Sequence, residues 1–226
     1  MAQPQFSTVT RAGGASSVLA TNKLIRNTYT LLSITLLFSA LMAGVSVMLR
    51  VPPMAYLLSI GGAFLLMWFV LPKTANSSSG IGVVFAITGL MGFGLGPIIS
   101  MYLGLPNGSQ IVGTAFGGTA AIFLGLSGYA LVSRRDFSFL GGFLFTGMIV
   151  VLLAAIGNIF FAIPALSLAI SAAVIFIMSG FILYDTSRMV NGGETNYLHA
   201  TVGLYLSIFN IFVSLLQLLG IMGGDD

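Results

Sequence analysis

Seven long apolar runs, almost free of charged residues, constrain this chain more than any other feature of its sequence. They cover residues 27–49, 54–71, 81–103, 111–132, 139–161, 165–190 and 196–220. A helix needs about 20 mostly apolar residues to cross a bilayer, and its backbone must satisfy its own hydrogen bonds there. The sequence therefore predicts an all-α membrane protein, with a bundle of seven transmembrane helices within residues 26–222.

The composition agrees with a protein embedded in lipid and excludes several other classes. Charged residues make up 6% of the chain and hydrophobic residues 57%, whereas about a quarter of the residues in a soluble domain are charged. The chain has no cysteine and one histidine, which excludes disulfides, thiolate metal sites and multi-histidine sites. We expect no enzymatic activity, no cofactor, no certain metal site and no nucleic-acid partner, with membrane lipid as the surroundings.

The positive charges predict the orientation of the bundle, because Lys and Arg gather on the cytoplasmic side of membrane proteins. One side holds Arg11, Lys23, Arg26, Lys73, Arg134, Arg135 and Arg188, and the other side holds Arg50. We therefore expect a cytoplasmic N-terminus and an outside C-terminus. Residues 1–25, rich in Ser, Thr, Gly and Gln, are expected to form a disordered cytoplasmic tail, and residues 223–226 a short acidic tail.

Small and polar residues follow one face of the last run and define what we call the seam. Its members are Gly203, Ser207, Asn210, Ser214 and Gln217, at helical spacings of four and three residues. Two interpretations stay open: a packing surface of small and hydrogen-bonding residues, or the lining of a polar path. Both place this helix in the interior. Similar stripes occur in the third run (Thr88, Gly92, Gly96, Ser100) and the first (Thr28, Thr35, Ser39, Ser46).

Asp185 is the one acidic residue within the predicted spans, and an ionisable group there marks a candidate functional site. One interpretation is an interfacial carboxylate paired with Arg188, three residues further along the same helix. The other is a buried carboxylate that faces the last helix, with Lys73 as a partner at the same cytoplasmic level. Both interpretations fit the sequence.

Two further patterns are expected to be structural or accidental. Glu194 and Thr195 are predicted to begin the last helix, where a carboxylate suits the helix dipole. The run Gly125-Leu126-Ser127-Gly128 matches the Gly-x-Ser-Gly motif of rhomboid intramembrane proteases, with His199 as a candidate base. We expect a chance match, because both residues fall toward the cytoplasmic side whereas the rhomboid site opens toward the outer face.

Several separate motifs, taken in their order along the chain, resemble one known family. They are Leu95-Gly96-Pro97-Ile98, Arg135-Asp136-Phe137-Ser138, Ile182-Leu183-Tyr184-Asp185, Leu204-Tyr205-Leu206 and Asn210-Ile211-Phe212. Residues 22–222 resemble the Bax inhibitor-1 (transmembrane BAX inhibitor motif) family. Residues 23–29, 73–76 and 192–197 are similar to its proteobacterial YccA-like branch.

The resemblance implies a bundle whose last helix is wrapped by the other six. For the YccA-like branch it implies a protein of the bacterial inner membrane that modulates FtsH, a membrane-anchored ATP-dependent protease, and is also its substrate. Other members behave as pH-sensitive calcium leaks gated by two aspartates. The first of these corresponds to Asp185 and the second to Ser207, so the coupled titration of two close carboxylates is missing here.

Two functions are therefore predicted. The first is binding and inhibition of the FtsH protease, with the chain itself a substrate. The alternative is a pH-sensitive calcium or cation leak through the bundle interior. Its ion-pathway candidates are Asp185, Ser207, Asn210 and Lys73, and the interior seam adds Gly203, Ser214 and Gln217. The missing second carboxylate favours the first function.

Overall fold

The computed structural model describes residues 12–223, which are almost entirely helical. In order, the elements are α1 (Ala12–Met48), α2 (Met54–Leu65), the π-helix η1 (Leu66–Val70), α3 (Leu71–Thr74), α4 (Ser79–Leu103), α5 (Gly108–Ser133), α6 (Leu140–Phe161), α7 (Pro164–Val190) and α8 (Tyr197–Met222). Helices α2, η1 and α3 are continuous and form one span. With it, the described residues contain seven helices that are long and apolar enough to cross a membrane. The predicted all-α bundle of seven such helices is confirmed.

Helix α1 begins well before the predicted first span. Residues 1–25 are predicted to be a disordered tail, but α1 starts at Ala12, so prediction and structure differ over residues 12–25. Hydropathy detects only the part of a helix that meets lipid, and no proline interrupts residues 12–48, so the helix continues beyond the apolar run. Residues 1–11 and 224–226, which include most of the predicted acidic tail, lie outside the described residues.

A proline explains the π-helix in the second span. Pro72 has no backbone N–H to donate to the carbonyl of Trp68, four residues earlier. The wider turn of η1, Leu66–Val70, ends just before it, and π-turns occur as single-turn insertions of this kind. The span therefore stays continuous from Met54 to Thr74.

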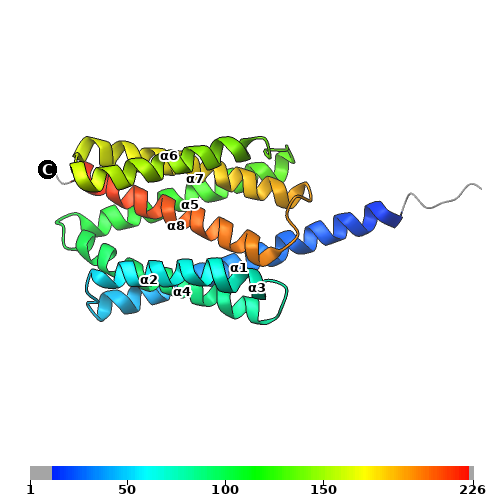
Figure 1. Ribbon diagram of the computed structural model, residues 1–226, viewed down its shortest axis with the longest axis horizontal. Coiled ribbons are helices and arrows are strands. Elements are labelled where there is room, and N and C mark those ends of the chain that lie inside the picture. Colours follow the sequence, from blue (N-terminus) through cyan, green and yellow to red (C-terminus); the bar gives the residue numbers. More distant parts are fainter. Residues whose placement is uncertain (1–11, 224–226) are drawn as a thin grey trace, which may run out of the picture.

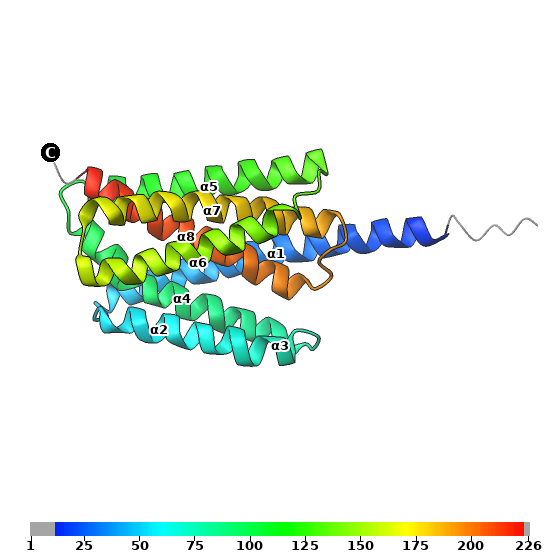
Figure 2. The same cartoon turned by 45° about the horizontal axis from the view of Figure 1, so that its top comes forward.

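Helix α8 lies between two groups of helices, with α1, α2 and α4 on one side and α5, α6 and α7 on the other (Figure 1). The turned view in Figure 2 shows the same arrangement. Helix α8 packs against α1, α4, α5 and α7, whereas α2 packs on α4 and α6 packs on α7. The central position of the last helix is confirmed. The expectation that all six others wrap it is wrong, because four helices already enclose it.

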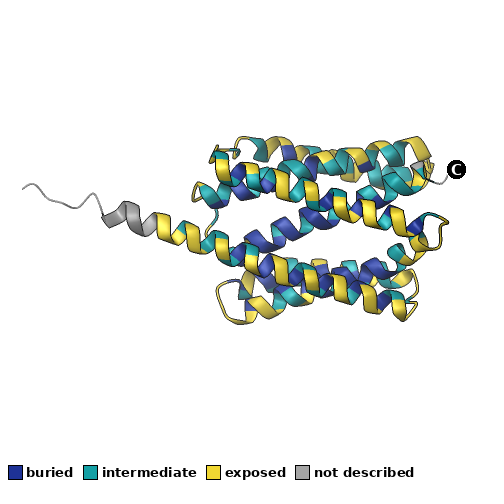
Figure 3. Ribbon diagram, turned by 180° about the vertical axis from the view of Figure 1, so that it is seen from behind, coloured by how far each residue is buried: buried dark blue, intermediate teal, exposed yellow. Residues whose placement is uncertain are grey.

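Burial follows this arrangement. Figure 3 shows a run of buried residues along α8 and on the sides of its neighbours that face it. The buried side chains of α8 include Leu198, Leu204, Tyr205, Ile211 and Leu216. Helix α6, which contacts only α7 among the spans, is mostly exposed and buries only Leu144. In lipid such an apolar exposed surface is expected, since the surroundings are as apolar as the side chains.

The small-residue stripes predicted in the first and third runs meet each other. A Cβ at Gly92 of α4 would lie 2.8 Å from the carbonyl carbon of Ser39 on α1, and a Cβ at Gly96 would lie 3.0 Å from that of Ser46. Only glycine permits such a close approach of two helix backbones. The α1–α4 contact is therefore a tight, backbone-to-backbone interface.

The two ends of the bundle differ in charge. Helix α1 enters at one end, and α8 ends at the other (Figure 1). We call the first end the α7–α8 end, since the connection between those helices lies there, and the opposite end the α1–α2 end. Among the described cations, Arg50 lies at the α1–α2 end, and the α7–α8 end holds Lys23, Arg26, Lys73, Arg134, Arg135 and Arg188.

Candidate functional site

Asp185 lies five residues before the end of α7 and directs its carboxylate at α8. Its Oδ2 atom lies 2.9 Å from the point that a Cβ would occupy at Gly203. The missing side chain at Gly203 therefore makes room for the carboxylate. The structure brings together two of the predicted site residues, one from the candidate ion pathway and one from the seam.

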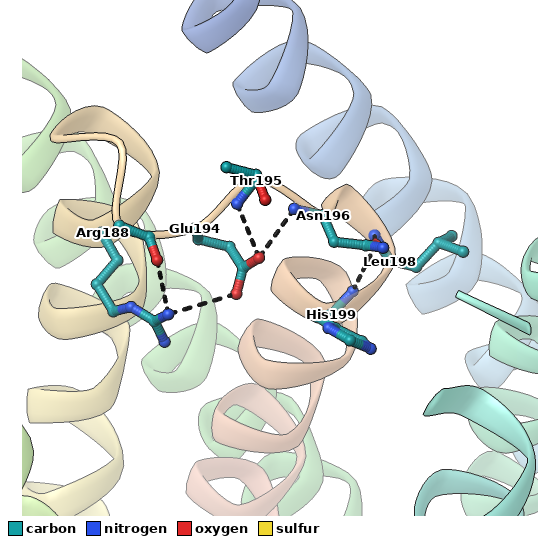
Figure 4. Close-up of polar contacts among 7 residues, drawn as sticks. Arg188, Glu194, Thr195, Asn196, Leu198 and His199 are labelled. Carbon is teal, nitrogen blue, oxygen red and sulfur yellow. Dashed lines mark hydrogen bonds and ion pairs between the residues drawn. The ribbon is translucent and has the colours of Figure 1, made fainter. Parts of the chain in front are cut away.

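Arg188 does not form the ion pair with Asp185 that one interpretation of the sequence expects. Its Nη2 donates a hydrogen bond to the Gly193 carbonyl at 2.7 Å and lies 3.7 Å from Glu194 Oε2 (Figure 4). The guanidinium also lies over the Tyr184 ring, 5.5 Å from its centre. Arg188–Glu194 is the single ion pair within residues 12–223. The arginine reaches across the connection, so no cation of the described residues forms an ion pair with the Asp185 carboxylate.

Asn196 caps α8 and ties the α7–α8 connection to the turn between α3 and α4. Its Oδ1 accepts a hydrogen bond from the backbone N–H two residues further on, at 2.9 Å. Its Nδ2 donates to the Ala75 carbonyl at 2.9 Å and to Asn76 Oδ1 at 3.1 Å. Glu194 Oε1 accepts from the N–H groups of Thr195 and Asn196, each at 2.8 Å. The cap is therefore Asn196, one residue beyond the predicted pair.

The middle of the seam uses its polar groups within α8. Ser207 is buried, and its hydroxyl donates to the Gly203 carbonyl at 3.2 Å. Asn210 Nδ2 donates to the Leu206 carbonyl at 2.8 Å, and Ser214 is also buried. Neither Ser207 nor Asn210 is hydrogen-bonded to Asp185. Such back-bonding lets a polar residue sit in an apolar interior without a partner on another helix.

The far end of the seam makes a polar contact with α7. Gln217 Oε1 accepts a hydrogen bond from Ser171 Oγ at 2.9 Å. Ser171 and Asp185 are as far apart on α7 as Gly203 and Gln217 are on α8, so the two contacts belong to one antiparallel register. Between them the seam meets the apolar stretch of α7 that includes Met178. The polar contacts are therefore confined to the two ends of the seam.

Lys73 is not brought to Asp185. It is exposed in the last turn of α3, at the surface of the α7–α8 end. No group of three or more His, Asp or Glu side chains within residues 12–223 is close enough to hold a metal ion. Asp136 is bonded by the Ser138 hydroxyl and backbone N–H, which lower the pKa of its carboxyl and keep it charged.

Three hydroxyls that the sequence analysis did not connect meet beside Asp185. Tyr29 of α1 hydrogen-bonds Ser127 of α5, and its Oη lies 3.3 Å from Oγ1 of Thr186 on α7. Ser127 and Thr186 are themselves 3.5 Å apart. A hydroxyl in an apolar run can donate to a backbone carbonyl of its own helix and needs no partner on another helix. The sequence therefore gives no signal that identifies which hydroxyls meet. We call these three residues the hydroxyl cluster.

The hydroxyl cluster also decides how Ser127 is to be interpreted. Its hydroxyl is bonded to Tyr29 and Thr186, while the His199 side chain is exposed in the first turn of α8 (Figure 4). A serine nucleophile needs a base within hydrogen-bond reach, and His199 is not such a partner here. The geometry supports a structural role for Ser127.

Comparison with known proteins gives consistent similarities. The sequence model of the family described as "Inhibitor of apoptosis-promoting Bax1" matches residues 21–224. The chain is 50% identical over 210 residues to the "Modulator of FtsH protease YccA" of Escherichia coli K12, which covers 93% of this chain and 95% of that protein. The "Inner membrane protein YccA" of Escherichia coli O6:H1 gives the same figures. An "Uncharacterized membrane protein" of Vibrio cholerae is 46% identical over 226 residues, all of both chains.

Proposed function

The chain belongs to the Bax inhibitor-1 family, described as inhibitor of apoptosis-promoting Bax1, and we propose that it binds and inhibits the membrane protease FtsH. We propose further that it acts without catalysing a reaction, that FtsH degrades it slowly, and that both proteins lie in the bacterial inner membrane. The family resemblance noted in the sequence motifs is confirmed.

The observation that carries the proposal is the similarity to the Escherichia coli protein named a modulator of FtsH protease. Identity is 50%, and the alignment covers 93% of this chain. The inner-membrane location is supported by the name of the second Escherichia coli relative and by the seven apolar helices. Inhibition, rather than modulation of some other kind, is our proposal.

The N-terminal part of α1 offers a segment that such a protease could grip. This part of α1 projects beyond the rest of the bundle (Figure 1), and Val18, Leu19 and Ala20 are exposed. Accessible terminal segments are where proteases engage a folded chain. Because the helices behind this segment are closely packed, extraction would be slow, and the enzyme would stay occupied while it proceeds.

The experiment that tests the proposal reconstitutes FtsH in proteoliposomes with a second membrane substrate. We expect the full-length chain to slow degradation of that substrate in proportion to its amount, because it occupies the enzyme. An unrelated seven-helix protein at the same protein-to-lipid ratio is the control. Degradation of the second substrate at the same rate with and without the chain would contradict the proposal.

Deletion of the projecting segment tests whether FtsH engages the chain there. Deletion of residues 2–20 should lengthen the half-life of the chain in cells that contain FtsH, because the enzyme loses its point of engagement. The half-life is measured by pulse-chase, with a chain that lacks the C-terminal residues 224–226 as control. An unchanged half-life would show that FtsH begins elsewhere.

We propose that the α7–α8 end faces the cytoplasm. The support is the charge difference between the two ends, since Lys and Arg favour the cytoplasmic side. Single cysteines in this cysteine-free chain test the orientation: Ser77→Cys, in the α3–α4 turn, should be labelled in inside-out vesicles. Ser109→Cys, at the start of α5, should be labelled in right-side-out vesicles. The reverse pattern would contradict the orientation.

A second candidate function is a pH-sensitive calcium or cation leak. The observation that favours it is the Asp185 carboxylate against Gly203 within the span. A leak through this site should change in Asp185→Asn, and Ser207→Asp should make it steeply pH-dependent by adding a second carboxylate. Calcium efflux from proteoliposomes at mildly acidic and mildly basic pH measures both. Efflux equal to that of protein-free liposomes at each pH would remove this function.

A further inference from the structure

Tyr29 makes the only direct side-chain hydrogen bonds between the two helix groups within residues 12–223. One group is α1, α2 and α4, and the other is α5, α6 and α7, with α8 between them. The Tyr29 hydroxyl on α1 bonds Ser127 on α5 and lies 3.3 Å from Thr186 on α7. The other polar links between the groups in this part of the chain run through α8 or through Asn196, the cap that precedes it. The hydroxyl cluster therefore joins the groups at the α7–α8 end.

The position of Tyr29 along α1 places it among the first contacts that would resist an applied pull. In the described part of the chain, Thr28 is the first fully buried residue of α1, and Tyr29 follows directly. Before them, Leu24 and Ile25 are only partly buried against the core. A chain pulled from its N-terminus thus meets the hydroxyl cluster before it meets the tight α1–α4 contacts at Ser39 and Ser46.

We propose that Tyr29 sets how slowly this chain is extracted by an ATP-driven membrane protease, and hence whether it acts as an inhibitor or as an ordinary substrate. This inference rests on the proposed function. While the hydroxyl cluster is intact, α1 stays attached to α5 and α7 and the chain occupies the enzyme. When the cluster is broken, the start of α1 separates from α5 and α7 more readily, and the chain is degraded faster.

The size of the effect follows from what one hydroxyl contributes inside a membrane protein. Interhelical hydrogen bonds there change stability by amounts that correspond to about three- to tenfold in an equilibrium constant. Forced unfolding is governed by the rate at which the native contacts break, and removal of a contact that is already broken at the barrier raises that rate by its full factor. We therefore expect Tyr29→Phe to speed ATP-dependent degradation of the chain about three- to tenfold.

Tyr29→Phe tests the hydrogen bonds alone, because it removes the hydroxyl and keeps the ring. The Tyr29 ring also lies 6.1 Å from the Phe123 ring, and phenylalanine keeps that contact. Ser127 and Thr186 stay hydrogen-bonded to each other, at 3.5 Å. Ser33→Ala is the control on the same helix: that hydroxyl is exposed and donates to the Tyr29 carbonyl at 2.8 Å, within α1. Ser127→Ala breaks the cluster from the α5 side.

The test uses full-length chains reconstituted with FtsH and ATP, and follows both the chain and a second membrane substrate. We expect Tyr29→Phe and Ser127→Ala to be degraded faster than wild type and to protect the second substrate for a shorter time. Ser33→Ala should match wild type. If wild type is slow and protective and Tyr29→Phe behaves identically, the inference is overturned while the proposed function stands.

A measurement without the protease separates the inference from the proposed function. Thr28→Cys places one thiol at a fully buried position whose hydroxyl has no partner among the described residues, in a chain that has no other cysteine. Adding Tyr29→Phe should speed labelling of this thiol by a water-soluble maleimide about three- to tenfold. Equal labelling rates would overturn the inference, even if FtsH proves to be the partner.

Discussion

The α1–α4 and α7–α8 interfaces both depend on glycine, but they use it in different ways. At Gly92 a Cβ would lie 2.8 Å from a backbone carbon of Ser39. At Gly203 a Cβ would lie 2.9 Å from the end of the Asp185 side chain. Backbone atoms cannot move away without displacing a helix, whereas a carboxylate can turn about its own bonds. The first interface is therefore fixed, and the second can adapt.

Two polar residues, one on each side of α8, differ in how their hydrogen bonds are satisfied. On the side of α1 and α4, Tyr205 of α8 hydrogen-bonds Ser39 Oγ at 2.6 Å and the Thr88 carbonyl at 3.2 Å. On the side of α7, Asp185 has no hydrogen-bonding side chain as its partner in the described residues, and Arg188 is bonded elsewhere. The contrast is between these two residues and not between whole interfaces, because Ser46 on α1 is buried without a hydrogen-bond partner among the described residues. On the other side, Gln217 of α8 is bonded to Ser171 of α7.

The largest effect is expected where backbone meets backbone. Gly92→Ala should push α1 and α4 apart and lower the free energy of unfolding by about 3 kcal/mol, the upper part of the range for overpacking. Denaturant titration in detergent measures this loss. Gly82→Ala is the control on the same helix, since a Cβ there meets no atom within 4 Å. Equal losses in the two variants would show that the close approach does not hold the interface.

The next effect tests the hydrogen bonds of the fixed side. Tyr205 is 1% exposed, so Tyr205→Phe leaves the Ser39 hydroxyl buried without that partner and should cost about 1.5 kcal/mol. The same titration measures it. Tyr129→Phe, with a side chain that is 49% exposed, should change the unfolding free energy little. A Tyr205→Phe variant as stable as wild type would show that these hydrogen bonds do not stabilise the fixed side.

A smaller effect is expected at the adaptable interface. Gly203→Ala should lower the unfolding free energy by about 1 kcal/mol, because the Asp185 carboxylate can turn away from the new methyl group. In an Asp185→Ala background the same change should cost almost nothing, so a double-mutant cycle should show the coupling. Identical costs in both backgrounds would mean that the Asp185–Gly203 contact does not determine the packing of α7 on α8.

The smallest effect concerns the connection between α7 and α8. Arg188 and Glu194 lie 3.7 Å apart with partly exposed side chains, and such pairs contribute about 0.5 kcal/mol or less. Glu194→Gln should therefore shift unfolding only slightly, and added salt should remove the difference. A loss larger than that of Gly203→Ala would show that the connection contributes more to the stability of α8 than the α7–α8 interface does.

The sequence predicted the parts of the fold that a single helix reveals by itself. Apolar length gives the spans, and apart from the start of α1 their ends differ from those of the helices by no more than three residues. Spacing along one helix gives the seam that marks α8 as central. The stripe containing Gly92 indicates a close helix contact. These features are local, because they depend on the residues of one segment and on the lipid around it.

What the sequence could not predict depends on partners from other segments. Arg188 has carboxylates on both sides in sequence, and the path of the chain after α7 decides in favour of Glu194. The hydroxyl cluster joins residues from three helices, and each hydroxyl could equally be satisfied within its own helix. Residues 12–25 lie outside the apolar run, so hydropathy gives no sign that α1 continues through them.

The measurement that most directly tests the central claim is whether the intact chain associates with FtsH in the membrane. Inner membranes containing the full-length chain are cross-linked and solubilised, and FtsH recovered with the chain is quantified against an unrelated seven-helix protein expressed to the same level. We predict FtsH in clear excess over that control. Recovery no greater than the control would contradict the proposed function and turn the search to ion flux at Asp185.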